Sequence, residues 1–310
     1  EVIMNLKTIL NNIKICKTDI LAFQPDVIIF IDYPGFNLRI AKWSKVLGFK
    51  NHYYISPQIW AWKESRIKEI KRDIDKMYVI LPFEKTFYED KHHFPVSFVG
   101  HPLIDAIQAH PVIDDATFRK ENQLNNLPII ALLPGSRKQE ITKMLSVMLS
   151  VADDFKRYQF VIAGAPSQEY SFYQQFITSD NIKFLSNKTY DLLQHATAAL
   201  VTSGTATLET ALFKVPEVVC YKGNWISYQI AKRIITLKYI SLVNLIMDKE
   251  VVTELIQDDC NTKRIASELQ KILEPEHRKI VLENYRILEE KLGGKGASST
   301  TAKLIVADLK

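Results

Sequence analysis

The stretch "IIALLPGSRKQEI", which runs from Ile129 to Ile141, shows how this chain is built. Its first five residues are apolar, a pattern typical of a strand buried on both faces of a parallel sheet. Beyond Arg137, apolar residues recur three and four positions apart, which predicts a helix. The turn between strand and helix presents free backbone N–H groups. Repeated units of this kind define an α/β protein.

The same alternation extends along most of the chain. We expect strands at residues 26–31, 52–55, 77–81 and 96–99, and again at 129–133, 160–163, 182–185, 198–201 and 216–220. The pattern after residue 261 is helical. These patterns predict two Rossmann-like domains, at residues 1–122 and 123–275. Residues 276–310 are predicted to be C-terminal helices that pack back on the first domain or on a dimer partner.

Composition narrows the class of protein. With 310 residues, 47% hydrophobic and 24% charged, the chain is large enough for two cores. Its three cysteines, Cys16, Cys220 and Cys260, are widely spaced, so we expect neither a disulfide framework nor a zinc site. The net charge of +5 suits a nucleotide, a sugar phosphate or an anionic membrane face. Lysine and arginine are scattered and no nucleic-acid motif is present, so nucleic acid is not an expected partner. A cytoplasmic location is expected.

The turn after the opening strand is a candidate anion site, formed by Gly135, Ser136 and Arg137. Glycine allows close backbone approach, a helix N-terminus favours negative charge, and arginine can make paired hydrogen bonds to phosphate oxygens. No Walker P-loop is present, because Gly-Lys-Ser/Thr is missing. The alternative is an ordinary turn between a strand and a helix, with a solvated arginine.

A second turn of the same kind follows residues 198–201 and contains Ser203, Gly204 and Thr205. Two such turns in one domain favour a nucleotide diphosphate as ligand. Glu209 lies one helical turn beyond Thr205, where a carboxylate can bind the hydroxyls of a ribose. Alternatively, it complements the helix dipole. The absence of G-x-G-x-x-G argues against NAD.

The first half offers a different chemistry. Asp32 ends a very apolar strand, and we predict that it acts as a general base toward a substrate hydroxyl. The alternative is a turn aspartate that bonds to its own loop. Asn37, Ser56, Trp60, Trp62 and His101 follow strand ends of this half and are candidates for contacting an acceptor or lining a cleft. Exposed tryptophans stack on sugars or contact acyl chains, whereas buried ones hold the loop in place.

Several segments together resemble lipid-A-disaccharide synthase. In chain order they are "FIDYPGFN" (30–37), "YISPQIWAW" (54–62), "LPFE" (81–84), "VGHPL" (99–103), "LPGSR" (133–137), "TSGTATLE" (202–209), "YISLVNLI" (239–246) and "ELIQ" (254–257). The resemblance covers nearly the whole chain, and "SPQIWAW" and "LPFE" are its most specific parts.

The resemblance implies an inverting glycosyltransferase of the B type, with two Rossmann-like domains facing a cleft. The implied donor is UDP-2,3-diacylglucosamine, the acceptor is 2,3-diacylglucosamine 1-phosphate, and the products are lipid A disaccharide 1-phosphate and UDP. Asp32 matches the proposed base, while Arg137, Glu209, Asn244 and Gln257 match positions that contact UDP. A homodimer is implied, and no cofactor or metal is expected.

The start of the chain departs from the family. Members begin with a strand and a Gly-Glu-x-Ser-Gly-Asp turn that this sequence lacks. We therefore expect an incomplete N-terminal domain that still binds UDP but turns over poorly. Two alternatives stay open. One is another UDP-sugar-using transferase or epimerase of this fold, and the other is an impaired nucleotide-sugar binding module.

An apolar segment opens the chain, with Val2, Ile3, Leu6, Ile9 and Leu10 as candidates for facing a membrane. Both implied substrates carry acyl chains, so the resemblance implies a peripheral enzyme on the cytoplasmic face of the inner membrane. The alternative is that these side chains pack under the sheet.

Overall fold

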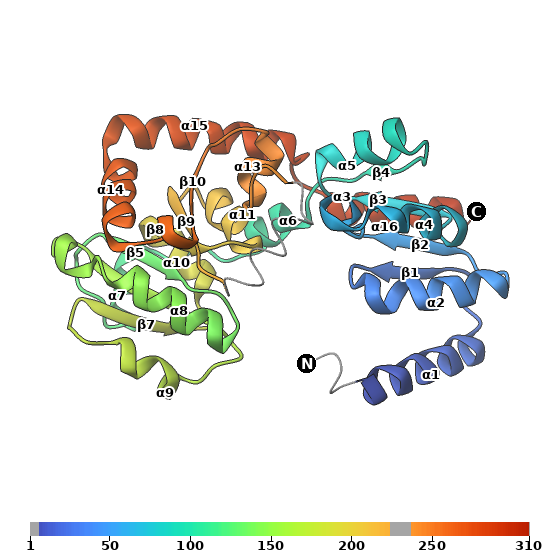
Figure 1. Ribbon diagram of the computed structural model, residues 1–310, viewed down its shortest axis with the longest axis horizontal. Coiled ribbons are helices and arrows are strands. Elements are labelled where there is room, and N and C mark those ends of the chain that lie inside the picture. The colour runs from blue at the N-terminus through green and yellow to red at the C-terminus, as the bar shows by residue number, and fades with distance from the viewer. Residues whose placement is uncertain (1–5, 224–236, 310) are drawn as a thin grey trace. The chain divides into compact units, whose positions relative to one another are not determined.

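The computed structural model describes residues 6–223 and 237–309, and its helices and strands are labelled in Figure 1. The chain divides into two compact units. Unit 1 comprises Glu1–Asp105 and Leu292–Lys310, and unit 2 comprises Ala106–Lys291. Each unit is built around one parallel sheet, which confirms the predicted α/β architecture with two Rossmann-like units.

Within its described residues, unit 1 contains a four-stranded parallel sheet in the order β1-β2-β3-β4. The strands are β1 (Ile28–Ile31), β2 (Asn51–Tyr54), β3 (Lys76–Val79) and β4 (Ser97–Phe98). The helices that precede or follow them are α1 (Leu6–Phe23), α2 (Pro34–Val46), α3 (Ile59–Trp62), α4 (Ile67–Asp73), α5 (Pro82–Thr86) and α6 (Pro102–Ala109), and short η1 (Glu64–Arg66) and η2 (Phe87–Lys91) complete the set. Tyr53, Ile70 and Val79 are fully buried in the core.

The last helix, α16 (Ala297–Asp308), belongs to unit 1, and in Figure 1 it lies in red among the blue elements of this unit. Asp105 holds its start by accepting hydrogen bonds from the N–H groups of Gly296 at 2.6 Å and Ser298 at 3.1 Å. The buried His52 pairs with Asp308 near its end, over 3.2 Å between Nε2 and Oδ2. Both ends of α16 are therefore fixed to the first half of the sequence.

Among the residues described, unit 2 has a six-stranded parallel sheet in the order β10-β9-β8-β5-β6-β7. Its strands are β5 (Ile129–Leu133), β6 (Gln159–Gly164), β7 (Ile182–Ser186), β8 (Ala196–Thr202), β9 (Glu217–Tyr221) and β10 (Thr253–Ile256). Its helices are α7 (Asp115–Glu121), α8 (Lys138–Leu149), α9 (Tyr170–Tyr173), α10 (Thr189–His195), α11 (Thr205–Leu212), α13 (Leu242–Met247), α14 (Thr262–Leu273) and α15 (Pro275–Lys291), with η3 (Ala152–Phe155), η4 (Gln174–Phe176) and η5 (Gln257–Asp259) between them.

Strand β5 explains why the opening stretch is so apolar. Ile130 and Leu132 belong to the core on one face of the sheet, and Ile129, Ala131 and Leu133 belong to the core on the other face. Helices cover both faces, so every residue of this central strand is buried.

The unit boundaries differ from the predicted domains in two places. The first division falls after Asp105 and not after residue 122, because Phe118 of α7 is buried in the core of unit 2. Its neighbour Arg119 donates to the carbonyls of Asn125 at 2.6 Å and Leu127 at 2.9 Å. Residues 106–122, which we assigned to the first predicted domain, are thus part of unit 2. Helix α15 likewise belongs to unit 2, and α16 belongs to unit 1.

Candidate active site

The two predicted anion turns are neighbours in unit 2. Strands β5 and β8 pair in parallel, with Leu133 opposite Val201, so the turns after them leave the same edge of the sheet side by side. Strands β6 and β7 continue from β5 in one direction, and β8 lies on its other side. This reversal of strand order is where open α/β sheets bind their ligands.

The turn after β5 has the backbone that its sequence predicts. Gly135 has φ +96°, a conformation that favours glycine, and a Cβ atom there would lie 2.3 Å from Oε2 of Glu140. The N–H of Ser136 donates to the same Oε2 at 3.3 Å. Ser136 and Arg137 are exposed just before α8 begins. A carboxylate oxygen thus already lies against the backbone that we predict to bind phosphate.

The turn after β8 is open. Gly204 has φ +141°, and a Cβ atom at this position would meet nothing within 4 Å. Ser203 donates to the carbonyl of Ile240 at 3.0 Å, while Thr205 is exposed at the start of α11. One helical turn later, Glu209 accepts a hydrogen bond from Tyr190 of α10 at 2.9 Å. The carboxylate predicted to bind ribose is therefore oriented by a neighbouring helix.

Asn244 has a structural role in α13. Its amide donates to the carbonyl of Val252 at 2.8 Å and to Glu254 at 2.9 Å, and its oxygen accepts from the N–H groups of Val251 and Val252. All its hydrogen-bonding groups are thus used inside the protein. Glu254 in turn accepts from the N–H groups of Ile240 and Ser241, both at 2.9 Å. Asn244 therefore holds the entry to α13 instead of presenting its amide to a ligand.

Gln257 shows a different pattern. It follows β10 in a left-handed conformation with φ +54°, which is strained for a residue other than glycine. Its side-chain Nε2 is buried and has no hydrogen-bond partner among the described residues. A buried donor without an acceptor is costly, so Nε2 is a candidate donor to a ligand at the same edge of the sheet.

In unit 1, Asp32 lines a pocket of about 250 Å³. The other lining residues are Pro34, Pro57, Gln58, Ile59, Trp62, Lys63 and Arg66. The pocket lies where β1 and β2 end and α2 and α3 begin, which is again the carboxyl edge of a parallel sheet. The Asp32 side chain is exposed to solvent.

The backbone around Asp32 is strained and firmly held. Asp32 and Tyr33 both have left-handed conformations, with φ +46° and +44°. The Asp32 carbonyl accepts hydrogen bonds from Tyr53 Oη at 2.6 Å and from the Asn37 amide at 2.7 Å. Strain of this kind persists where surrounding contacts impose it, and it concentrates at functional sites. Asn37 lies in the first turn of α2, and its hydrogen bond to the Asp32 carbonyl holds the backbone of the preceding turn.

Glu84 joins two of the motifs and was missed as a functional candidate in the sequence. Its carboxylate, 1% exposed, accepts from Ser56 Oγ at 2.5 Å and Trp60 Nε1 at 3.1 Å. The N–H groups of Ile80 and Leu81 donate to its other oxygen at 3.2 and 3.0 Å. Burial raises the pKa of Glu84, and these four donors oppose that shift. The signal was present, because "SPQIWAW" and "LPFE" each carry one side of this network.

The two tryptophans of this loop have different roles. Trp60 packs edge-on against Phe83, with ring centroids 4.8 Å apart, and helps to fix the loop. Trp62 is 53% exposed and faces the Asp32 pocket. Trp60 therefore holds the loop in place, whereas Trp62 stays a candidate for contact with a sugar or an acyl chain.

His101 is buried and is not part of the Asp32 pocket. Its Nδ1 accepts a hydrogen bond from the N–H of Leu103 at 3.2 Å, so the ring stabilises the start of α6. Burial lowers the pKa of His101 to about 4. The imidazole is therefore neutral at physiological pH.

The membrane-facing candidates are only partly described. Val2 and Ile3 lie outside the described residues, and α1 begins at Leu6. Ile9 is half-buried and Leu10 is 52% exposed. The side of α1 that packs on the core carries Ile13, Cys16 and Ile20. Within residues 6–223 and 237–309, every helix is too short or too polar to cross a membrane.

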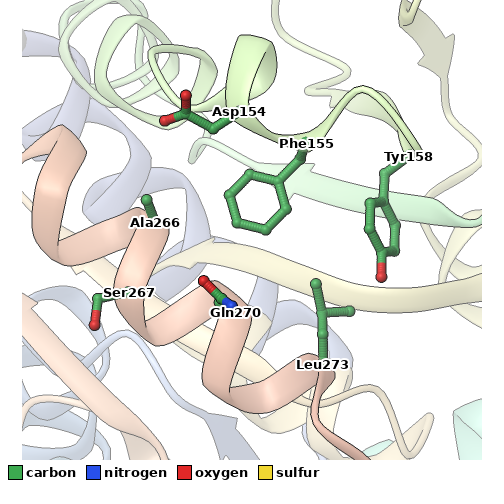
Figure 2. A pocket seen from close by; sticks show the side chains of 7 residues that line it. All are labelled: Asp154, Phe155, Tyr158, Ala266, Ser267, Gln270 and Leu273. Carbon is green, nitrogen blue, oxygen red and sulfur yellow. The ribbon is translucent and has the colours of Figure 1, made fainter.

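A larger pocket of about 460 Å³ lies elsewhere in unit 2, between η3 and α14 (Figure 2). Its lining residues are Asp154, Phe155, Tyr158, Ala266, Ser267, Gln270 and Leu273. Because η3 precedes β6, this pocket lies toward the amino ends of the strands. None of the predicted site residues lines it.

These features define a class: an α/β protein with two Rossmann-like units, whose two predicted anion turns lie at the switch point of one sheet, as in the B-type glycosyltransferase fold. Solved structures share this fold. The UDP complex of MnaA from S. aureus has a TM-score of 0.67 at 13% identity, covering 98% of this chain and 82% of that one. The calicheamicin glycosyltransferase CalG4 has a TM-score of 0.61 at 14% identity, covering 98% and 78%.

Comparison of sequences identifies the family. The sequence model of the lipid-A-disaccharide synthetase family matches residues 1–306. The chain therefore belongs to this family of glycosyltransferases, which act in lipid A biosynthesis. The lipid-A-disaccharide synthase of Syntrophus aciditrophicus is 40% identical, covering 100% of this chain and 82% of the relative. Lipid-A-disaccharide synthase 1 of Legionella pneumophila is 38% identical with the same coverage. The resemblance found in the sequence is confirmed.

Proposed function

We propose that this chain transfers the sugar of UDP-2,3-diacylglucosamine to the 6-hydroxyl of 2,3-diacylglucosamine 1-phosphate. The products are lipid A disaccharide 1-phosphate and UDP. Two observations together support this proposal. Unit 1 has an exposed aspartate, Asp32, on a strained backbone, and unit 2 has two adjacent predicted anion turns at the switch point of its sheet. The mechanism requires the acceptor held by unit 1 to meet the donor held by unit 2.

Asp32 is the proposed base. The acceptor oxygen attacks the anomeric carbon of the donor from the side opposite the diphosphate, and its proton passes to the Asp32 carboxylate. The new carbon–oxygen bond forms as the bond to the diphosphate breaks, so the configuration at that carbon inverts. Tyr53 and Asn37 hold the Asp32 backbone in place, which fixes the point from which its side chain extends.

Unit 2 supplies the nucleotide side. The N-termini of α8 and α11 and the guanidinium of Arg137 stabilise the charge that develops on the departing diphosphate. Glu209, held by Tyr190, is placed to accept hydrogen bonds from ribose hydroxyls. The buried Nε2 of Gln257, which has no acceptor in the part of the chain that the structure describes, is a proposed donor at the same edge. Asn244 supports this side through the position of α13.

The proposal is tested by incubating the purified chain with both acylated substrates in detergent micelles and identifying the product by mass spectrometry. We expect the tetraacyl disaccharide 1-phosphate and an equal amount of UDP. Asp32→Asn should lower kcat by about 10²-fold or more. Asp26→Asn, an exposed carboxylate outside the pocket, is the matched control and should keep wild-type turnover.

Other products would point to the alternatives. An epimerised nucleotide sugar, or UDP release that Asp32→Asn leaves unchanged, would overturn the assignment of Asp32 and of the reaction. UDP binding without any product would instead support a nucleotide-sugar binding module.

The proposal includes the place of action. Apolar side chains are exposed on α1, with Leu10 at 52%, Ile15 at 50% and Leu21 at 47%. Both proposed substrates are lipids, which supports a peripheral enzyme on the cytoplasmic face of the inner membrane. A homodimer is proposed on the resemblance to the family alone. Light scattering of the purified chain tests it, and a monomer at micromolar concentration would contradict it.

A further inference from the structure

Two cations share the pocket of Asp32. Lys63 ends the short helix α3, and Arg66 closes the η1 turn that follows. The N–H of Arg66 donates to the Lys63 carbonyl at 3.1 Å, which sets these residues one tight turn apart. In such a turn, side chains three positions apart lie on the same side. Both line the pocket together with Asp32.

Both cations are associated with Trp62. The Lys63 ammonium lies 5.7 Å from the centroid of its ring, and the Arg66 guanidinium carbon lies 5.4 Å away. These are cation–π distances, which orient the charged groups without neutralising them. Trp60, anchored to Glu84, fixes the loop that carries all three side chains.

The positive charge of this pair is not compensated by protein. Within the described part of the chain, neither Lys63 nor Arg66 lies within 4.0 Å of a carboxylate. Glu64, between them in sequence, pairs with Lys91 at 2.7 Å and with His92 at 3.0 Å. The pocket therefore has two cations against the single carboxylate of Asp32. Such a pocket attracts an anion.

We propose that Lys63 and Arg66 bind the phosphate of the acceptor, a sugar 1-phosphate monoester. This inference rests on the proposed function, because it assigns the anion to the substrate whose hydroxyl Asp32 deprotonates. The 1-phosphate is on C1 and the 6-hydroxyl is on the hydroxymethyl group of C5, so the ring sets the distance between them. Binding the phosphate on the α3–η1 turn therefore limits where the 6-hydroxyl can lie, and Asp32 lines the same pocket. Arg66 can bind two phosphate oxygens at once, whereas Lys63 adds a point charge.

The pair thus determines specificity between acceptors. A sugar without the phosphate leaves both cations unpaired and loses the contact that sets its direction. A donor bound by its nucleotide does not depend on either residue. The inference predicts a defect that is confined to one substrate.

The test compares two acceptors, one with the 1-phosphate and one with a free 1-hydroxyl, in detergent micelles. For Arg66→Ala and Lys63→Ala, we expect KM for the phosphorylated acceptor to rise about tenfold or more, since each variant loses charge-assisted hydrogen bonds to the phosphate. KM for the donor, and kcat/KM for the free 1-hydroxyl acceptor, should change less than about twofold. Arg66→Lys should restore part of the loss. Lys68→Ala, an exposed residue of α4 outside the pocket, is the control.

Equal losses with both acceptors, or no loss with either, would overturn the assignment. A binding measurement separates this outcome from failure of the proposed function. Calorimetric titration of the Asp32→Asn chain with each acceptor needs no turnover. If the wild-type chain makes no disaccharide but the Asp32→Asn chain prefers the phosphorylated sugar, and Arg66→Ala abolishes that preference, the phosphate site stands and the reaction does not. If the preference survives Arg66→Ala, the phosphate site is wrong whatever the reaction.

Discussion

Ser56 and Glu84 form a buried hydrogen bond of 2.5 Å that ties the loop after β2 to the start of α5. The same carboxylate oxygen accepts from Trp60, so one residue fixes the loop that brings Trp62, Lys63 and Arg66 to the pocket. Glu84 is therefore a positioning residue, which acts through the loop and not on the substrate.

Replacing Glu84 by alanine should lower both stability and turnover. The change leaves buried donors at Ser56, Trp60 and Leu81 without an acceptor, which costs about 1–3 kcal/mol for each buried group left unpaired. Thermal unfolding should show a clearly lower midpoint, and KM for the acceptor should rise. The exposed Glu69→Ala is the control. A midpoint within one degree of wild type would argue against this role.

Arg137→Ala should weaken UDP binding about tenfold or more, because a charge-assisted contact to the diphosphate is lost. Isothermal titration with UDP and with uridine provides the measurement, and binding of uridine should hardly change. Arg157→Ala, exposed before the amino end of β6, serves as the comparison. A similar loss for uridine would show that Arg137 does not act on the phosphates.

Glu209→Gln should weaken binding of UDP more than binding of its 2′,3′-dideoxy analogue, since the carboxylate is assigned to the ribose hydroxyls. Tyr190→Phe removes the 2.9 Å hydrogen bond that orients Glu209 and should have a smaller effect of the same kind. Competition titrations measure both. An equal effect on the two nucleotides would remove the ribose assignment.

Glu217 should make stability depend on pH. Both its carboxylate oxygens are buried and have no hydrogen-bond partner within residues 6–223 and 237–309. Burial, followed by the nearby charge of Glu254, raises the pKa of Glu217 well above its ordinary value. The folded state thus holds this proton more tightly than the unfolded state. The resulting stabilisation is complete below the unfolded pKa of about 4.3 and is lost as pH rises through the folded pKa.

Glu217→Gln removes this dependence. The variant should gain stability over wild type as pH rises from about 4.3 toward the folded pKa, by up to about 1.4 kcal/mol per pH unit. Unfolding midpoints at pH 5 and pH 8 test this, with the exposed Glu250→Gln as the control. A difference between variant and wild type that is the same at both pH values would show that Glu217 is already ionised in the folded chain.

The exposed apolar face of α1 should bind lipid. Replacing Leu6 and Leu10 by serine should lower co-sedimentation with anionic vesicles while leaving the unfolding midpoint nearly unchanged. Leu10 is 52% exposed, so little burial is lost. Val112→Ser, 91% exposed in unit 2, is the matched control. Unchanged sedimentation of the double variant would leave α1 without a role at the membrane.

The sequence predicted most strands of the two sheets. Short apolar runs such as Ile129–Leu133 are typical of strands that are buried on both faces of a sheet. The prediction failed at β10, where Thr253 and Glu254 interrupt the apolar pattern at the edge of the sheet. The domain boundary was also misjudged. The polar stretch around Phe118 belongs to unit 2 because this single aromatic side chain is buried in its core.

The position and backbone conformation of the candidate turns could be predicted from the sequence, whereas their role in binding stays a prediction. Gly135, Gly204 and Asp32 follow strands, and strand ends share one edge in each sheet. Side-chain networks were not predictable from spacing. Glu84 meets Ser56 from 28 positions away, and Asn244 uses its amide inside the protein. Only the fold reveals which polar residues are already occupied.

Helix α16 has a consequence for how the chain is made. Lys50 and His52 contact Asp308 across more than 250 positions, so unit 1 is built from two segments that are synthesised before and after unit 2. Unit 2 is continuous from Ala106 to Lys291, so every residue that it contains is synthesised before α16. We therefore expect unit 2 to fold without α16, and unit 1 to reach its final structure only after α16 has been synthesised.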